Sequence, residues 1–82
     1  MVELWRDGAA ITEGGVLVVD ERAAPGHGDC LLLRGVDFMR VVRMDVQAGR
    51  LRFLSMSGGQ EIELDLDAVE FCGVVVGQYR RL

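Results

Sequence analysis

Val16-Leu17-Val18-Val19, between Gly14-Gly15 and Asp20-Glu21, is the stretch that decides the fold. A run of branched and aliphatic residues bounded by turn residues is typical of a short β-strand. Apolar runs closed by turns recur along the chain at residues 30–33, 41–46, 51–54 and 69–79. Roughly six or seven short strands with turns every 8 to 12 residues predict an all-β barrel or coiled sheet.

Two further segments refine this prediction. Glu61-Ile62-Glu63-Leu64-Asp65-Leu66-Asp67 alternates strictly, which predicts a strand with its aliphatic residues on one face and its acids on a solvated face. Val74-Val75-Val76 has no alternation, which is typical of a strand covered on both faces by the core or by a partner. Residues 4–13 have room for one short helical turn, which Gly8 weakens.

The length and composition limit the kind of protein that this chain can be. The 82 residues are enough for one domain, spanning 1–82, and too few for two. Nine arginines, no lysine and thirteen Asp and Glu give a formal net charge of −4, so we expect no direct binding of nucleic acid. No signal peptide begins the chain and no apolar run approaches the ~20 residues of a membrane span. We therefore expect a cytoplasmic protein that does not contact a membrane.

Few side chains could hold a metal or a cofactor. One histidine, His27, lies in a Gly-rich loop, and the two cysteines, Cys30 and Cys72, are far apart in the sequence. This is not the spacing of zinc ligands, so we expect no metal and no cofactor. His27 is expected to face solvent or to form a hydrogen bond in its turn, and the cysteines are expected to be free thiols in the core.

Nucleophilic catalysis would need one of three hydroxyls, those of Thr12, Ser55 and Ser57. No nucleophile-elbow motif marks any of them, although composition alone leaves a Ser–His–Asp arrangement open. A Ser–Lys dyad is excluded, because the chain contains no lysine whose amine could act as the base.

Four stretches, in order and with matched spacing, resemble the C-terminal domain shared by LexA, UmuD and phage CI-type repressors. They are ITEGGVLVVD at 11–20, HGDCLLL at 27–33, LRFLSMS at 51–57 and FCGVVVGQYRRL at 71–82. The resemblance runs from Asp7 to Leu82, and the order of the stretches is more specific than any one of them. It implies an all-β fold of LexA/signal-peptidase-like coiled sheets with a small barrel-like core.

The departures from this family decide the expected function. In the family a Gly-Asp-Ser-Met motif places the nucleophile nine residues before the glycine of an acidic-Gly-Asp turn; counting back from Gly14 reaches Trp5. The basic lysine of the family falls at Val42, and Gly15 replaces the aspartate of the turn. The resemblance thus implies a degenerate Ser–Lys peptidase domain with no catalytic residue. We expect its former active site to be closed and packed, with Trp5 filling the space near Val42.

The family uses this domain for self-association through its C-terminal strand. Carried over, this implies a homodimer whose interface contains Phe71, Gly73, Val74, Val75, Val76, Gly77 and Tyr79. The expected function is a dimerisation or oligomerisation domain of a LexA/CI-like transcriptional regulator, of phage or SOS-response type, that has lost autoproteolysis. DNA would be contacted only by a separate N-terminal domain, and an antirepressor or other regulatory protein would relieve repression. The alternative is a stand-alone UmuD-like module that heterodimerises with a family member or binds a polymerase or an antirepressor.

Overall fold

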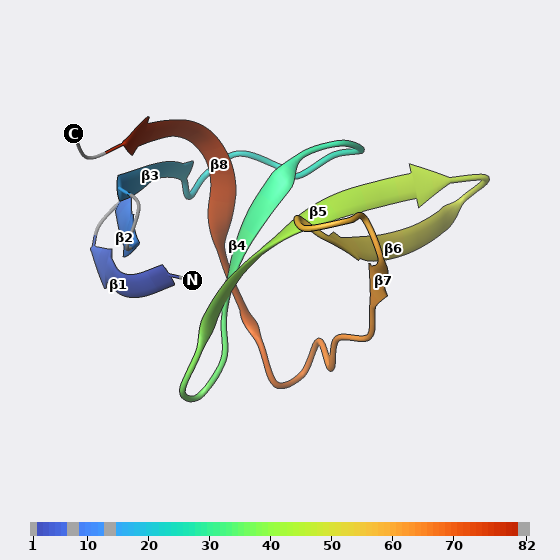
Figure 1. The fold of residues 1–82 in the computed structure, drawn as a ribbon. Helices are drawn as coiled ribbons and strands as arrows, with labels where there is room; N and C mark the ends of the chain where they lie inside the picture. Colours follow the sequence, from blue (N-terminus) through green and yellow to red (C-terminus); the bar gives the residue numbers. More distant parts are fainter. Residues whose placement is uncertain (1, 7–8, 13–14, 81–82) are drawn as a thin grey trace.

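The computed structural model describes residues 2–6, 9–12 and 15–80, and this part of the chain is all-β with no helix. Its strands form one eight-stranded sheet in the order β1-β2-β3-β8-β4-β5-β6-β7, and every paired neighbour is antiparallel (Figure 1). The predicted all-β class is confirmed. The strands are β1 (Val2–Arg6), β2 (Ala9–Thr12), β3 (Gly15–Asp20), β4 (Cys30–Arg34), β5 (Met39–Gln47), β6 (Arg50–Ser55), β7 (Glu61–Ile62) and β8 (Glu70–Arg80).

The apolar runs predicted as strands are confirmed by β3, β4, β5, β6 and β8, but two local predictions are wrong. The described residues of 4–13 form no helical turn; they belong to β1 and β2, which pair with Trp5 opposite Ala10. The strand predicted over 61–67 ends after Ile62, and the chain then forms a turn in which the Ala68 N–H donates to the Asp65 carbonyl (2.9 Å). Ile62 and Leu64 still pack against the core. The alternating pattern therefore indicates which side chains are partly buried, although the segment after Ile62 pairs with no strand of the described chain.

The last strand, β8, joins the two halves of the sheet. Its residues 74–80 pair with β3, and its residues 70–74 pair with β4. Val74 is the crossover point, since it lies opposite Asp20 on one side and Leu31 on the other. In Figure 1, β8 is the long curved strand between the β1–β3 group and the β4–β7 group. One strand therefore fixes how the two groups sit relative to each other.

The sheet is open, because its end strands β1 and β7 do not pair with each other in the described residues. It curls enough that the backbone of β1 approaches β5. Strong twist and curl are the normal consequence of right-handed strand geometry in a sheet of many strands. The barrel-like core implied by the resemblance is thus a curved sheet and not a closed barrel.

The buried apolar side chains form two clusters, and β4 contributes to both. Leu32 packs with Val19 in one cluster, whereas its neighbours Leu31 and Leu33 pack with Val42 and Val74 in the other. Successive residues of a strand point to opposite faces, so β4 is covered on both faces. This explains why residues 31–33 are aliphatic without alternation.

Of the three consecutive valines of β8, two are covered by the core and one is exposed. Val74 belongs to the cluster of Val42, and Val75 packs against the opposite cluster, as the lack of alternation predicts. Val76 is 61% exposed. It lies at an irregularity of the ladder, where Val18 pairs with Gly77 and Val19 pairs with Val75. The extra residue of such a bulge is left without a cross-strand partner, which turns Val76 outward.

Gly73 lies where β8 passes very close to β3. Its φ is 153°, and a Cβ atom there would lie 2.4 Å from Val19 Cγ1 and 2.7 Å from the carbonyl oxygen of Asp20. A backbone oxygen cannot move aside as the end of a long side chain can. Glycine is therefore required for the two halves of the sheet to meet in this way.

We predict that Gly73→Ala lowers the free energy of unfolding by about 2–4 kcal/mol, from the steric overlap and the unfavourable backbone conformation together. Gly77→Ala on the same strand is the matched control, because its added Cβ would meet only Val18 Cβ, at 3.7 Å. Urea unfolding followed by circular dichroism measures both. Equal stability of the two variants would contradict the close approach of β8 to β3.

Candidate functional site

Val42, the position that the resemblance assigns to the lysine, is fully buried at the centre of the curved sheet. It lies in β5, opposite Leu31 of β4 and Ser55 of β6. Its side chain is 0% exposed and packs with Leu31, Leu33 and Val74. An ammonium group at this place would lose its hydration without gaining an ion pair. The surroundings of position 42 therefore suit an aliphatic side chain.

Trp5, the position that the resemblance assigns to the nucleophile, is described only by its backbone. Trp5 lies in β1, the strand whose backbone approaches β5, the strand that carries Val42. The side chain of Trp5 and the side chain of Thr12 lie outside the described residues. That the side chain of Trp5 packs near Val42 stays a prediction.

The hydroxyls of Ser55 and Ser57 hydrogen-bond within their own turn. Their Oγ atoms are 3.2 Å apart, and Ser55 Oγ also lies 3.2 Å from both the backbone N–H and the carbonyl oxygen of Ser57. Among the hydrogen bonds of the described residues, neither hydroxyl contacts an imidazole or a carboxylate. The arrangement is that of a polar turn between β6 and β7.

His27 is held in a structural network on another part of the molecule. The Val46 N–H donates to His27 Nδ1 (3.0 Å), which confirms the expected hydrogen bond of this loop residue. The same Nδ1 lies 3.7 Å from an oxygen of Asp45. His27 thus ties the loop before β4 to the end of β5.

Asp45 and Arg52 form an ion pair that the sequence analysis missed. Asp45 is the buried charged residue of the described chain, 7% exposed, and Arg52 donates to its Oδ2 from Nε and Nη2 at 3.0 and 2.7 Å. The hydrogen bond and charge of Asp45 raise the pKa of Arg52. The two residues lie directly opposite each other on β5 and β6. The sequence signal that could have predicted this ion pair is the opposite charge of two residues at facing positions of neighbouring strands.

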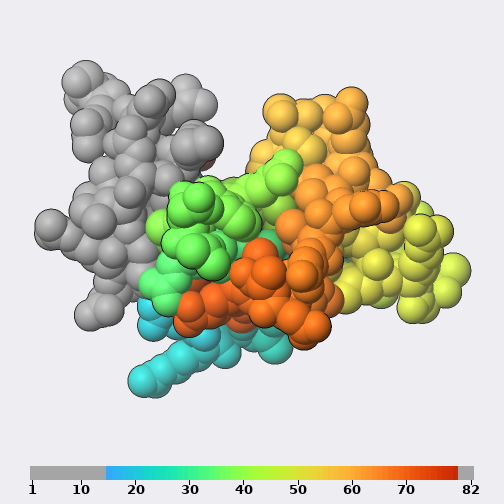
Figure 2. All heavy atoms as spheres, turned by 90° about the horizontal axis from the view of Figure 1, so that it is seen from below, coloured from blue at the N-terminus to red at the C-terminus, as the bar shows by residue number. Residues whose placement is uncertain are grey.

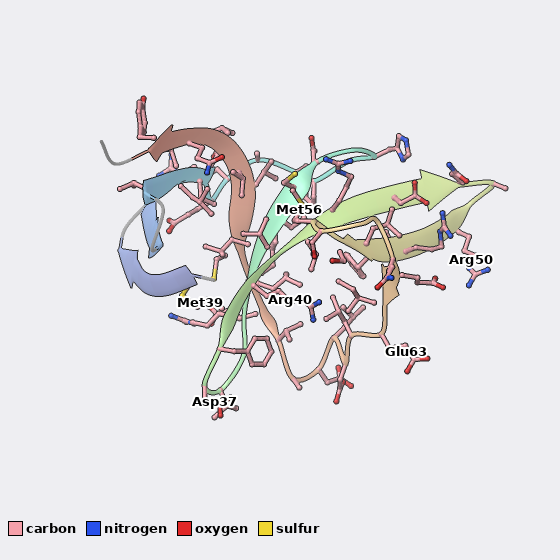
Figure 3. All side chains as sticks on the ribbon, viewed as in Figure 1. Asp37, Met39, Arg40, Arg50, Met56 and Glu63 are labelled. Atoms are coloured by element: carbon pink, nitrogen blue, oxygen red, sulfur yellow. The ribbon has the colours of Figure 1, made fainter. Side chains whose placement is uncertain are left out.

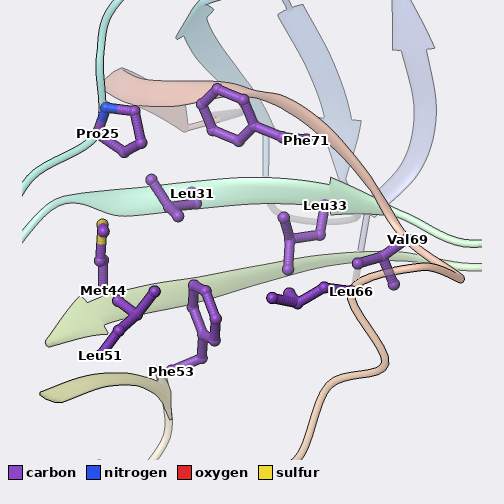
Figure 4. A pocket seen from close by; sticks show the side chains of 9 residues that line it. All are labelled: Pro25, Leu31, Leu33, Met44, Leu51, Phe53, Leu66, Val69 and Phe71. Carbon is purple, nitrogen blue, oxygen red and sulfur yellow. The ribbon is translucent and has the colours of Figure 1, made fainter.

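An apolar pocket of about 270 Å³ is the second feature that the sequence analysis missed. It opens on the face of the sheet that carries Leu31 and Leu33, and every residue that lines it is apolar (Figure 4). Leu66 and Val69, from the segment between β7 and β8, close one end of it. In Figure 2 this segment (orange) lies between the turn that joins β4 to β5 (green) and the turn that joins β5 to β6 (yellow). The lining residues are Pro25, Leu31, Leu33, Met44, Leu51, Phe53, Leu66, Val69 and Phe71.

The residues expected at a dimer interface lie in three different environments. Gly73 and Val74 are buried inside the chain's own sheet, and Val75 and Gly77 are half-buried. Phe71 is exposed at the rim of the apolar pocket. Val76 and Tyr79 are 61% and 68% exposed. Among the expected interface residues that follow Val74 in β8, these two present large side chains to solvent.

One edge of β8 has no neighbouring strand beyond Val74. The pairing of β8 with β4 ends at Val74, and beyond it Val75 and residues 77–80 are paired on the β3 side only. The backbone hydrogen bonds found for loop 26–29 run to Met44 and within the loop, and none of those in the described chain reaches residues 75–80 of β8. Within the described chain, the backbone of residues 76–80 therefore presents a free strand edge.

The described residues contain no group of three His, Cys, Asp or Glu side chains that could hold a metal ion. Cys30 and Cys72 are free and half-buried. Burial raises the pKa of the Cys72 thiol above its ordinary value of 9.0, although the charge of Arg34 opposes the shift. At neutral pH the thiol therefore keeps its proton and is a poor nucleophile. The described part of the chain also contains no helix with the length and apolarity needed to cross a bilayer.

We predict that a lysine at position 42, introduced by Val42→Lys, lowers the free energy of unfolding by about 4 kcal/mol or more, because an ammonium group would be buried without a partner. Val46→Lys in the same strand is the matched control and should change stability by less than about 1 kcal/mol, since Val46 is 39% exposed. Urea unfolding measures both. A stably folded Val42→Lys chain would contradict the closed packing around position 42.

Comparison of the chain with protein-family models, with curated proteins and with solved structures found no match.

Proposed function

We propose that this chain is a non-catalytic self-association domain of a LexA/CI-like transcriptional regulator that has lost autoproteolysis. A separate N-terminal domain would contact DNA, and this domain would hold two copies together and so set the spacing of the half-sites. The observation that carries the proposal is the free edge of β8 at residues 76–80, flanked by the exposed side chains of Val76 and Tyr79. Two copies that pair along this edge would continue the sheet across a two-fold axis.

The packing of position 42 supports the loss of self-cleavage. A Ser–Lys peptidase needs an unprotonated amine in a cleft that a hydroxyl can reach. Val42 supplies no amine, it is fully buried, and Ser55, its neighbour across the β5–β6 ladder, is bonded within its own turn. Val42 thus packs in the core and Ser55 stabilises its own turn, so neither residue replaces a member of the Ser–Lys dyad.

We expect the chain to be a dimer by light scattering at about 50 μM, with a monomer–dimer equilibrium that shifts on dilution. The double variant Val76→Lys/Tyr79→Lys should weaken dimerisation about tenfold or more, because like charges would face each other across the two-fold axis. Val36→Lys is the matched control, since Val36 is 99% exposed at the turn between β4 and β5. A wild-type chain that stays monomeric at this concentration would overturn the proposal.

We also expect the intact mass of the chain to stay unchanged during incubation at mildly alkaline pH. The incubation should stay below pH 9.0, the ordinary pKa of a thiol. Burial raises the pKa of Cys72 in the folded state. The contribution of this shift to the free energy of unfolding is therefore fully present below pH 9.0, and it is lost as the pH rises through the raised pKa. Mass spectrometry over several hours is the measurement, and any cleavage within the chain would contradict the loss of peptidase activity.

The alternative proposal is a stand-alone UmuD-like module that binds a family member, a polymerase or an antirepressor. The apolar pocket is the observation that favours it, because a pocket remote from the free edge of β8 offers a second place for a partner. The mass of the native product in extracts of the source organism separates the two. A product longer by roughly 60 to 130 residues supports the repressor, whereas a product of this chain alone supports the module.

A further inference from the structure

The apolar pocket is open, and its rim exposes large apolar side chains. Leu51, Leu66 and Phe71 are 46%, 59% and 41% exposed, and all three line it. A single exposed leucine needs no explanation, but several around one hollow form the kind of patch that marks a binding site. In Figure 4 the pocket lies between Leu31 and Leu33 of β4 and the side chains of Phe53 and Leu66. Its floor is therefore the core of the domain itself.

The segment that closes one end of the pocket carries an excess of negative charge. Residues 61–70 contain five carboxylates and no basic residue. Two of them are neutralised, since Glu61 pairs with Arg50 (3.4 Å) and Glu70 pairs with Arg34. The other three, Glu63, Asp65 and Asp67, have no basic partner among the ion pairs of the described residues.

These three carboxylates lie close to the pocket in the chain. Asp65 and Asp67 flank Leu66 directly, so the side chain that lines the pocket lies between two acids. Glu63 extends outward from the segment that follows β7 (Figure 3). A partner that inserts an apolar side chain beside Leu66 would bring its own flanking residues next to these acids. Complementary charge at those positions would then be basic.

The size of the pocket limits what can fill it. About 270 Å³ lies just below the range of roughly 300 to 1,000 Å³ that is usual for small-molecule and cofactor sites. No polar side chain lines the pocket to orient a small ligand. A volume of this size suits one or two side chains of a peptide, held from the rim by charge and by the backbone.

We propose that this pocket binds a short peptide segment of a partner protein, with one or two large aliphatic or aromatic side chains inserted and with arginine or lysine on either side of them. The apolar anchor would fill the space between Leu33, Phe53 and Leu66. The basic residues would pair with Asp65, Asp67 and Glu63. The proposal does not depend on dimerisation through β8, because the pocket faces the other end of that strand.

The test uses fluorescein-labelled synthetic peptides with the core Leu-Phe, flanked on both sides by two arginines, and ¹⁵N–¹H correlation spectra of the full chain. The Arg-flanked peptide should shift the amide signals of Leu51, Leu66 and Phe71 and should bind at least tenfold more tightly than the same core flanked by glutamates. Added salt should weaken it. No shift at these residues up to millimolar peptide, or equal binding of the two peptides, would overturn the proposal.

Two variants separate the apolar contact from the charge. Leu66→Ser should weaken binding about tenfold without unfolding the chain, because Leu66 is exposed and lies outside the strands. The triple variant Glu63→Gln/Asp65→Asn/Asp67→Asn should also weaken it about tenfold, and its Asn at 65 keeps the oxygen that accepts from the Asp67 N–H in the native turn. Asp37→Asn, at the turn between β4 and β5, is the control that should bind as the wild type does.

The same variants distinguish this proposal from the self-association of the chain. If Leu66→Ser converted the dimer to a monomer, a second copy would be the occupant of the pocket, and the peptide proposal would fail. If Leu66→Ser lost peptide binding and kept the dimer, the pocket would be a separate docking site. Failure of dimerisation itself, with peptide binding intact, would leave this inference standing and overturn only the proposed function.

Discussion

The rest of the structure depends on the close approach of β8 to β3 at Gly73. At this point a Cβ would overlap the carbonyl oxygen of Asp20, and one residue later Val74 pairs with strands on both of its sides. Because β8 passes from β4 to β3 here, its two ends lie in different surroundings. The end that begins at Glu70 borders the apolar pocket, and the end that runs to Arg80 has, among the described residues, no strand on its second edge. One tight crossing thus creates both surfaces on which the chain could bind another molecule.

Burial at position 42 decides which chemistry the fold can support. A strand covered on both faces, β4, packs Val42 from one side with Leu31 and Leu33, and this leaves no polar contact for a charged side chain. The Asp45–Arg52 pair and His27 brace the far end of β5, and Asp65 and Asp67 flank Leu66, which lines the pocket. The molecule combines an apolar interior with charged side chains on its surface.

The strands themselves could be predicted from the sequence, because runs such as residues 30–33 and 51–54 are local patterns closed by turns. The order of the strands could not, because β8 pairs with β3 across more than half of the chain. Residues 61–67 show why alternation alone misleads, because Leu64 is partly buried against the core although it does not belong to a strand. The pocket was missed because its residues come from five separate segments, and each of them looks like ordinary core when taken alone. The exposed Val76 depends on a bulge that no local pattern marks.

The proposed function requires that two copies pair along the free edge of β8. Hydrogen–deuterium exchange, compared between a concentrated sample and one diluted about a hundredfold, tests it most directly. The account predicts that the amides of residues 76–79 exchange more slowly in the concentrated sample, while the amides of β5 and β6 exchange equally in both. Exchange at residues 76–79 that is independent of concentration, in a sample that light scattering shows to be dimeric, would contradict the account and place the interface elsewhere.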